Sequence, residues 1–188
     1  MRNGQRRRTV SNTACPESLR IAGIQQDSIV DGPGIRYVIF TQGCPHHCPG
    51  CHNPQTHDPK GGREADVHRI LSQIAANPLA SGVTFSGGEP FWQAEALVLV
   101  AEEVKKLGKH LMIYTGYLYE QLADSGEPGV RRLLELADLL VDGPFVMEKR
   151  DLTLPYRGSS NQRVIDLLKT REQGEMVLYR SGYDALSF

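Results

Sequence analysis

The sequence predicts an α/β fold, a partial (β/α) barrel of parallel strands that is open on one side. Two features favour this class. Short apolar strands alternate with helices, which is the pattern of a parallel sheet with right-handed helical crossovers. The cysteine-rich and glycine-rich segments each follow a strand, and such sheets bind ligands at the carboxyl ends of their strands. Because a full barrel takes about 250 residues, we expect about six strands from 188 residues.

The first half of the chain supplies two strands and two helices. A turn signal, DGPG at 31–34, precedes a β-branched and aromatic strand at 36–40. Apolar residues at helical spacing predict a helix at 63–77. The segment GVTFSGG at 82–88 reads as a buried strand that ends in glycines, and a helix at 92–107 follows it.

The second half continues the alternation. A strand is predicted at 110–116, and helical patterns follow at 117–123 and 129–137. The segment DLLVDG at 138–143 is a further strand that ends in an acid and a glycine. A last helix is expected at 162–169.

Composition and charge indicate an ordinary soluble domain. Hydrophobic residues make up 40% of the chain and the net charge is −1, so no nucleic acid or membrane partner is indicated. We expect a disordered tail at 1–18, which holds Arg6 to Arg8 and Cys15, one domain at 19–170 and an extension at 171–188. No signal peptide is apparent, and three grouped cysteines with one distant cysteine suit a reducing cytoplasm.

The stretch CPHHCPGCHN at 44–53 carries the chemistry. Its thiols, at Cys44, Cys48 and Cys51, have the spacing C-x3-C-x2-C. A zinc site would need a fourth ligand, which a neighbouring histidine or Cys15 could supply. The alternative is a 4Fe–4S cluster held by three thiolates, with one iron left open for a substrate to coordinate. S-adenosylmethionine coordinates iron in this way through its amino and carboxylate groups.

The cysteine spacing, with GGEP at 87–90 after a later strand, resembles the radical S-adenosylmethionine (SAM) superfamily. The resemblance implies a barrel of the radical SAM type, with Cys44, Cys48 and Cys51 as ligands of one 4Fe–4S cluster. It also implies that Gly87, Gly88 and Glu89 contact the methionine amino group of S-adenosyl-L-methionine. Glycines allow a close backbone approach, and a carboxylate accepts hydrogen bonds from an ammonium.

A narrower resemblance rests on six motifs that occur in this order along the chain: DGPGIRYVIFTQGC, CPGCHNPQTH, SGGEP, YTGY, LVDGPF and RGSSNQ. Together they are similar to the activating proteins of anaerobic ribonucleoside-triphosphate reductases. Glycine before the third cysteine, here Gly50, is usual in that group. The resemblance implies further cofactor contacts from Gly50, Cys51, His52, Thr115 and Asp142. No catalytic side chain is implied beyond the cluster and SAM.

In that group a reduced cluster cleaves S-adenosylmethionine, and the resulting radical removes hydrogen from a glycine of the reductase. The implied partners are therefore an anaerobic ribonucleotide reductase, which is a glycyl radical enzyme, and flavodoxin or ferredoxin as electron donor. Two alternatives stay open. One is another small radical SAM enzyme, either an activase of the pyruvate formate-lyase type or a small-molecule synthase. The other is a non-catalytic zinc-binding module.

Other polar residues of these motifs have plainer explanations. His46 and His47 are expected to be solvated in an exposed loop, and Trp92 to serve packing. Asp31 either forms a turn or faces the open side of the cluster. The segment 157–161 either caps the expected helix or contacts a ligand or partner.

Overall fold

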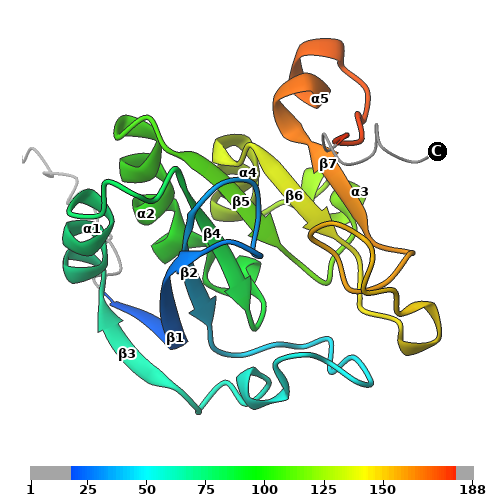
Figure 1. The fold of residues 1–188 in the computed structure, drawn as a ribbon, viewed down its shortest axis with the longest axis horizontal. Coiled ribbons are helices and arrows are strands. Elements are labelled where there is room, and N and C mark those ends of the chain that lie inside the picture. Colours follow the sequence, from blue (N-terminus) through cyan, green and yellow to red (C-terminus); the bar gives the residue numbers. More distant parts are fainter. Residues whose placement is uncertain (1–17, 181–188) are drawn as a thin grey trace, which may run out of the picture.

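A seven-stranded sheet forms the centre of the computed structural model, which describes residues 18–180 (Figure 1). The strands are β1 (Ser18–Ser28), β2 (Arg36–Thr41), β3 (Arg63–Asp66), β4 (Gly82–Gly87), β5 (His110–Tyr114), β6 (Leu139–Asp142) and β7 (Arg163–Asp166). Their order across the sheet is β3-β1-β2-β4-β5-β6-β7. The central strands β2, β4, β5 and β6 run parallel, whereas β1, β3 and β7 pair antiparallel toward the edges. The fold is therefore mixed α/β, as predicted.

Helices cover one face of this sheet. They are α1 (Val67–Ala75), α2 (Ala94–Lys106), α3 (Tyr119–Ala123), α4 (Pro128–Leu136) and α5 (Leu167–Gln173), with 3-10 turns at Pro54–Thr56, Pro90–Gln93 and Met147–Lys149. Helix α2 packs against both α1 and α4. Because side chains alternate along a strand, one set faces these helices and forms the core: Tyr37, Ile39, Val83, Phe85, Leu111, Ile113 and Leu140.

The opposite face carries polar residues beside a smaller apolar cluster of Met112, Leu139, Val141 and Val164, and it is crossed by the loop between β1 and β2 (Figure 1). Arg36, which is fully buried, donates from Nε to Thr84 Oγ1 at 3.0 Å and from Nη2 to the carbonyls of Val83 and His110. Thr84 Oγ1 donates in turn to Asp31 O at 2.8 Å. Burial lowers the pKa of Arg36 to about 10. This arginine therefore fixes the DGPG turn against the sheet.

One strand was missed, and two expected helices each begin later than predicted. Strand β1 was not predicted, although it pairs with both β2 and β3. Residues 63–66 form β3 rather than the start of a helix, and 163–166 form β7. Both strands end in an aspartate that caps the next helix: Asp66 accepts from Arg69 N, and Asp166 from Lys169 N, each at 3.0 Å. The capping thus comes from Asp166 and not from the segment 157–161.

Residues 1–17 and 181–188 lie outside the described part of the chain. Strand β1 begins at Ser18, and the arginines 6–8 and Cys15 lie outside the described residues. Helix α5 runs across position 171, where the C-terminal extension was expected to begin, and Tyr179 N donates to Val164 O of β7 at 2.8 Å. None of the helices within residues 18–180 is long and apolar enough to cross a membrane.

Candidate functional site

A cavity of about 620 Å³ opens at the carboxyl ends of the parallel strands. Loops after β2, β4, β5 and β6 contribute to its wall, together with the turn before β2. Its lining residues are Val30, Asp31, Phe40, Cys44, His46, Cys48, Cys51, His52, Asn53, Ser86, Gly87, Gly88, Tyr114, Thr115, Gly116, Gly143, Phe145, Leu152, Leu154, Tyr156, Arg157, Gly158 and Gln162. The structure therefore brings together the strand ends that the sequence singled out.

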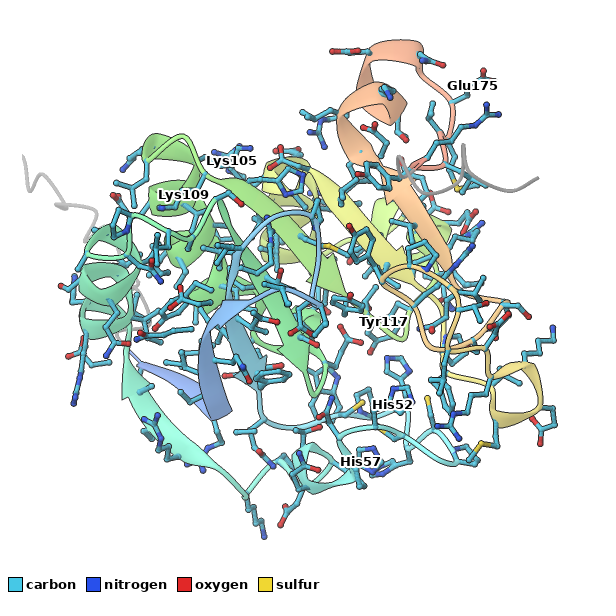
Figure 2. The ribbon with its side chains drawn as sticks, viewed as in Figure 1. His52, His57, Lys105, Lys109, Tyr117 and Glu175 are labelled. Atoms are coloured by element: carbon cyan, nitrogen blue, oxygen red, sulfur yellow. The ribbon has the colours of Figure 1, made fainter. Side chains whose placement is uncertain are left out.

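The cysteine loop is closed at its base by the protein's own hydrogen bonds. Gly43 N donates to Thr56 O at 2.8 Å, and Cys44 N donates to His57 O at 3.2 Å. The buried amide of Gln42 donates to the carbonyls of Gln55 and Asp58 at 3.0 and 2.7 Å. Figure 2 shows His52 and His57 in this part of the molecule, with Tyr117 nearby. The loop thus has a fixed place at the end of β2.

The three thiols suit an iron–sulfur cluster. Cys44, Cys48 and Cys51 are free, half-buried and all in the wall of the same cavity. Within residues 18–180, no three His, Cys, Asp or Glu side chains are grouped to hold a single metal ion. A cluster has no such requirement, because its own irons and sulfides lie between the thiolates. Burial raises the pKa of the Cys44 thiol, and bound iron would offset that cost by stabilising the thiolate.

Gly87 and Gly88 form a cradle beside the cysteine loop. Gly88 N donates to Thr41 O, and Gly87 has a φ of +94°. A Cβ on Gly88 would lie 2.3 Å from Gly43 O, and one on Gly87 would lie 2.7 Å from the Phe40 Cα. Both positions therefore require glycine, because the backbone of the neighbouring strand or loop leaves no room for a side chain.

Glu89, next in the motif, is fully buried and is not among the lining residues. Its Oε2 accepts from Gly116 N at 2.9 Å and lies 2.9 Å from His46 Nε2, while its Oε1 accepts from Phe91 N at 3.0 Å. The Thr115 hydroxyl donates to the same carboxylate at 2.9 Å. A carboxylate offers about four acceptor sites, so this network uses the capacity of Glu89 to join β4, β5 and the cysteine loop.

The expectation that His46 is solvated was wrong. Its side chain is 17% exposed, contacts Glu89 and meets the Tyr117 ring edge-on, with ring centroids 4.5 Å apart. His47 is exposed, as expected, and meets the His57 ring at 5.0 Å. The histidines of the loop therefore differ in role, since His46 anchors the loop to the ends of β4 and β5.

Thr115 lines the cavity, whereas Asp142 is fully buried and is not among the lining residues. Asp142 forms an ion pair with Arg163, its cross-strand neighbour on β7, and accepts from Tyr119 N at 2.8 Å. Glu120 joins the same arginine at 2.8 Å, and this hydrogen bond lowers the pKa of Glu120 to about 2. Asp142 thus fastens β7 and α3 to the end of β6.

The far wall of the cavity comes from the long segment between β6 and β7. Gly50 has a φ of +72°, and a Cβ there would meet Met147 Cε at 2.2 Å, so Gly50 packs against this segment and lies outside the lining. His52, which lines the cavity, packs against Phe145 with the two rings tilted by 50° and their centroids 4.9 Å apart. The segment therefore touches the cysteine loop beside its third cysteine.

Several lining residues escaped the sequence interpretation. Tyr114 and Tyr156 form part of the wall, and burial raises the pKa of Tyr114. Val30 and Leu152 line the cavity although they are 71% and 74% exposed, so they mark an apolar rim. The alternation of strand β5 was the available signal for Tyr114, whereas no local pattern pointed to Leu152.

The cavity, with three thiols of one loop and a glycine cradle beside them, fits an iron–sulfur protein, and the family follows from comparison. Residues 30–165 match the 4Fe-4S single cluster domain, and the chain belongs to this family.

Among curated relatives, the anaerobic ribonucleoside-triphosphate reductase-activating protein of Escherichia coli K12 is 32% identical, over 72% of this chain and 91% of the relative. The pyruvate formate-lyase 1-activating enzyme of the same organism is 35% identical, over 80% of this chain and 61% of the relative. A solved structure, QueE from Escherichia coli, aligns over 53% of each chain with a TM-score of 0.44 and 20% identity.

Proposed function

We propose that this protein is a radical SAM activase of an anaerobic ribonucleoside-triphosphate reductase. The observation that carries the proposal is that three thiols from one loop open onto a cavity that the adjoining glycine cradle also lines. When bound, a 4Fe–4S cluster would supply one electron for the reductive cleavage of S-adenosyl-L-methionine, and the radical formed would remove hydrogen from a glycine of the reductase.

The chain's own residues would hold and orient these groups. Cys44, Cys48 and Cys51 would bind three irons, leaving the fourth open to the ligand. The ammonium of the ligand would meet the backbone of Gly87 and Gly88, both of which line the cavity. Glu89 would act beneath them, by holding the cysteine loop to the ends of β4 and β5. His52 and Thr115, which line the cavity, would contact the nucleoside, whereas Gly50 would act only through its packing against Met147.

The rim of the cavity suits a polypeptide substrate. Val30 and Leu152 expose apolar side chains at the cavity, and Ile29 beside Val30 is 76% exposed. A flexible loop carrying a glycine can pass such a rim and bury these side chains against its own. A small polar metabolite would instead need several convergent polar groups.

The relatives support the reductase as partner. The reductase-activating relative is covered over 91% of its length, whereas the pyruvate formate-lyase activase is covered over 61%. The chain therefore spans nearly all of the first relative but a smaller share of the second, which makes the activase of pyruvate formate-lyase the second candidate. We further infer that the sheet is a partial barrel open on one side, and that the protein works in the cytoplasm with flavodoxin or ferredoxin as electron donor.

Transfer of a labelled hydrogen atom tests the proposal. The protein, anaerobically reconstituted and reduced, is mixed with S-adenosylmethionine and an anaerobic ribonucleotide reductase carrying deuterium on its glycine α-carbons. A glycyl radical on the reductase and deuterium in 5′-deoxyadenosine are expected. Label transfer from pyruvate formate-lyase, with none from the reductase, would favour the second candidate. Product formed without label from either protein would refute both.

A further inference from the structure

The segment between β6 and β7 places one arginine, Arg157, in the wall of the cavity. Among the described residues that line the cavity, it is the single lysine or arginine. None of the ion pairs found within residues 18–180 includes it. An arginine is charged at every physiological pH, so the cavity holds a permanent positive charge with no carboxylate bound to it.

The guanidinium of Arg157 is held in place but only partly satisfied. One amino group donates to Gln162 O at 2.9 Å, while Nε is buried and has no hydrogen-bond partner in the described chain. An unpaired buried N–H group is unfavourable unless a ligand or water accepts from it. The fork of a guanidinium matches the two oxygens of a carboxylate, which would satisfy these donors together.

The backbone around Arg157 is rigidly attached to the end of β6. The side-chain oxygen of Gln162 accepts from Gly158 N at 2.9 Å, and its amide donates to Gly143 O at 3.1 Å. Gly158 lies against the cysteine loop, since a Cβ there would meet His52 Cε1 at 2.8 Å. The turn therefore holds Arg157 in a fixed position beside the third cysteine. Polar groups of a binding site need such support from neighbouring hydrogen bonds to be preorganised for a ligand.

We propose that Arg157 binds the carboxylate of S-adenosylmethionine at the cluster. The inference rests on the proposed function and names the residue that positions the amino-acid end of the cofactor. A 4Fe–4S core bound by three thiolates would carry a net negative charge, which reduction would increase, and the ligand carboxylate would lie beside it. A permanent cation beside the cluster loop stabilises that charge and orients the carboxylate through two parallel hydrogen bonds.

Equilibrium binding to the reconstituted, oxidised protein tests the assignment without turnover. Two ligands are compared, S-adenosylmethionine and its decarboxylated analogue, on the wild-type chain, Arg157→Gln and Arg157→Lys. Arg150→Gln is the matched control, because Arg150 belongs to the same segment, is exposed and does not line the cavity. Iron content is measured for every sample.

Arg157→Gln should weaken S-adenosylmethionine binding about tenfold to a hundredfold, as expected for losing charge-assisted hydrogen bonds, and should change analogue binding by less than about twofold. Arg150→Gln should leave both affinities unchanged. If Arg157→Gln loses iron, Arg157→Lys carries the comparison, because it keeps the charge and loses the fork; it should bind S-adenosylmethionine about threefold to tenfold more weakly.

Equal weakening of both ligands would overturn the assignment to the carboxylate. Unchanged S-adenosylmethionine affinity with weaker binding of the reductase would also overturn it, by placing Arg157 at the partner. Both outcomes leave the proposed function intact. Failure of the wild-type chain to bind S-adenosylmethionine would overturn the cofactor assignment and this inference together.

Discussion

Replacing Glu89 with glutamine separates two roles for the acidic residue of the GGEP motif. In the structure its carboxylate faces donors on both oxygens: Phe91 N donates to Oε1, and Gly116 N donates to Oε2. Glutamine is nearly the same shape but replaces one oxygen with an NH₂ group. Whichever way the new amide points, that group meets a backbone N–H, so a hydrogen bond becomes a clash between donors.

The expected cost follows from this geometry. A hydrogen bond to a charged group contributes about 1.5–3 kcal/mol, and a buried donor left unpaired costs about 1–3 kcal/mol. Glu89 is 0% exposed to solvent, so water cannot replace a hydrogen-bond partner that is lost. We therefore expect Glu89→Gln to lower the free energy of unfolding by about 3 kcal/mol, a large share of the 5–15 kcal/mol typical of a domain.

Urea unfolding of the iron-free protein measures this cost apart from any ligand. Glu172→Gln, at an exposed position in α5, is the control and should change the free energy of unfolding by less than about 0.5 kcal/mol. Iron retention should also fall in Glu89→Gln, because His46 of the cysteine loop contacts this carboxylate. An unchanged urea midpoint with lost S-adenosylmethionine binding would refute the argument and assign the carboxylate to the ligand.

Three further predictions concern iron, glycine and pH. Anaerobic reconstitution should give about four irons per chain. Alanine at Cys44, Cys48 or Cys51 should abolish the brown colour of the cluster, whereas Cys15→Ala should leave it. Stoichiometric zinc without iron uptake would contradict the cluster. Gly88→Ala should lose iron as well as S-adenosylmethionine affinity, because its Cβ would lie 2.3 Å from Gly43 O. Gly126→Ala is the control, because a Cβ there would have nothing within 4 Å. Full iron retention in Gly88→Ala would contradict the clash. Burial, with Arg36 nearby, lowers the pKa of His110 from 6.5 to about 4, so the unfolded chain binds the proton first and the free energy of unfolding should fall between pH 6.5 and 4. The fall should be roughly 2 kcal/mol after allowance for solvent screening, urea unfolding in His110→Asn should lack it, and an equal fall in that variant would contradict the assignment.

The parallel strands could be predicted because each is a short apolar run bounded by turn residues. The edge strands could not. In β1 only Leu19, Ile21 and Ser28 are buried, so its pattern is too weak to distinguish it from a loop. In β3 and β7 a capping aspartate joins the strand directly to a helix, and the helical spacing beyond it dominated the interpretation.

The candidate site divides in the same way. That the cysteines and glycines would lie around one cavity was predictable, because the cysteines share one loop and the ends of parallel strands converge. The partners of Glu89 were not, since His46 and Thr115 lie 43 and 26 residues away in sequence and no local pattern joins them. The buried position of Arg36 was hidden for the same reason, because its acceptors are carbonyl groups of other strands.

The closure of the cysteine loop by Gln42 and Gly43 affects what happens to the protein when oxygen destroys its cluster. Hydrogen bonds at 2.7–3.0 Å join the two ends of the loop without any contribution from iron. Closing a flexible loop of roughly a dozen residues costs about 2 kcal/mol of entropy, and here the chain itself meets that cost. We therefore expect the base of the cysteine loop to stay closed after oxygen has destroyed the cluster. A new cluster could then be assembled in the same protein molecule, without new protein synthesis.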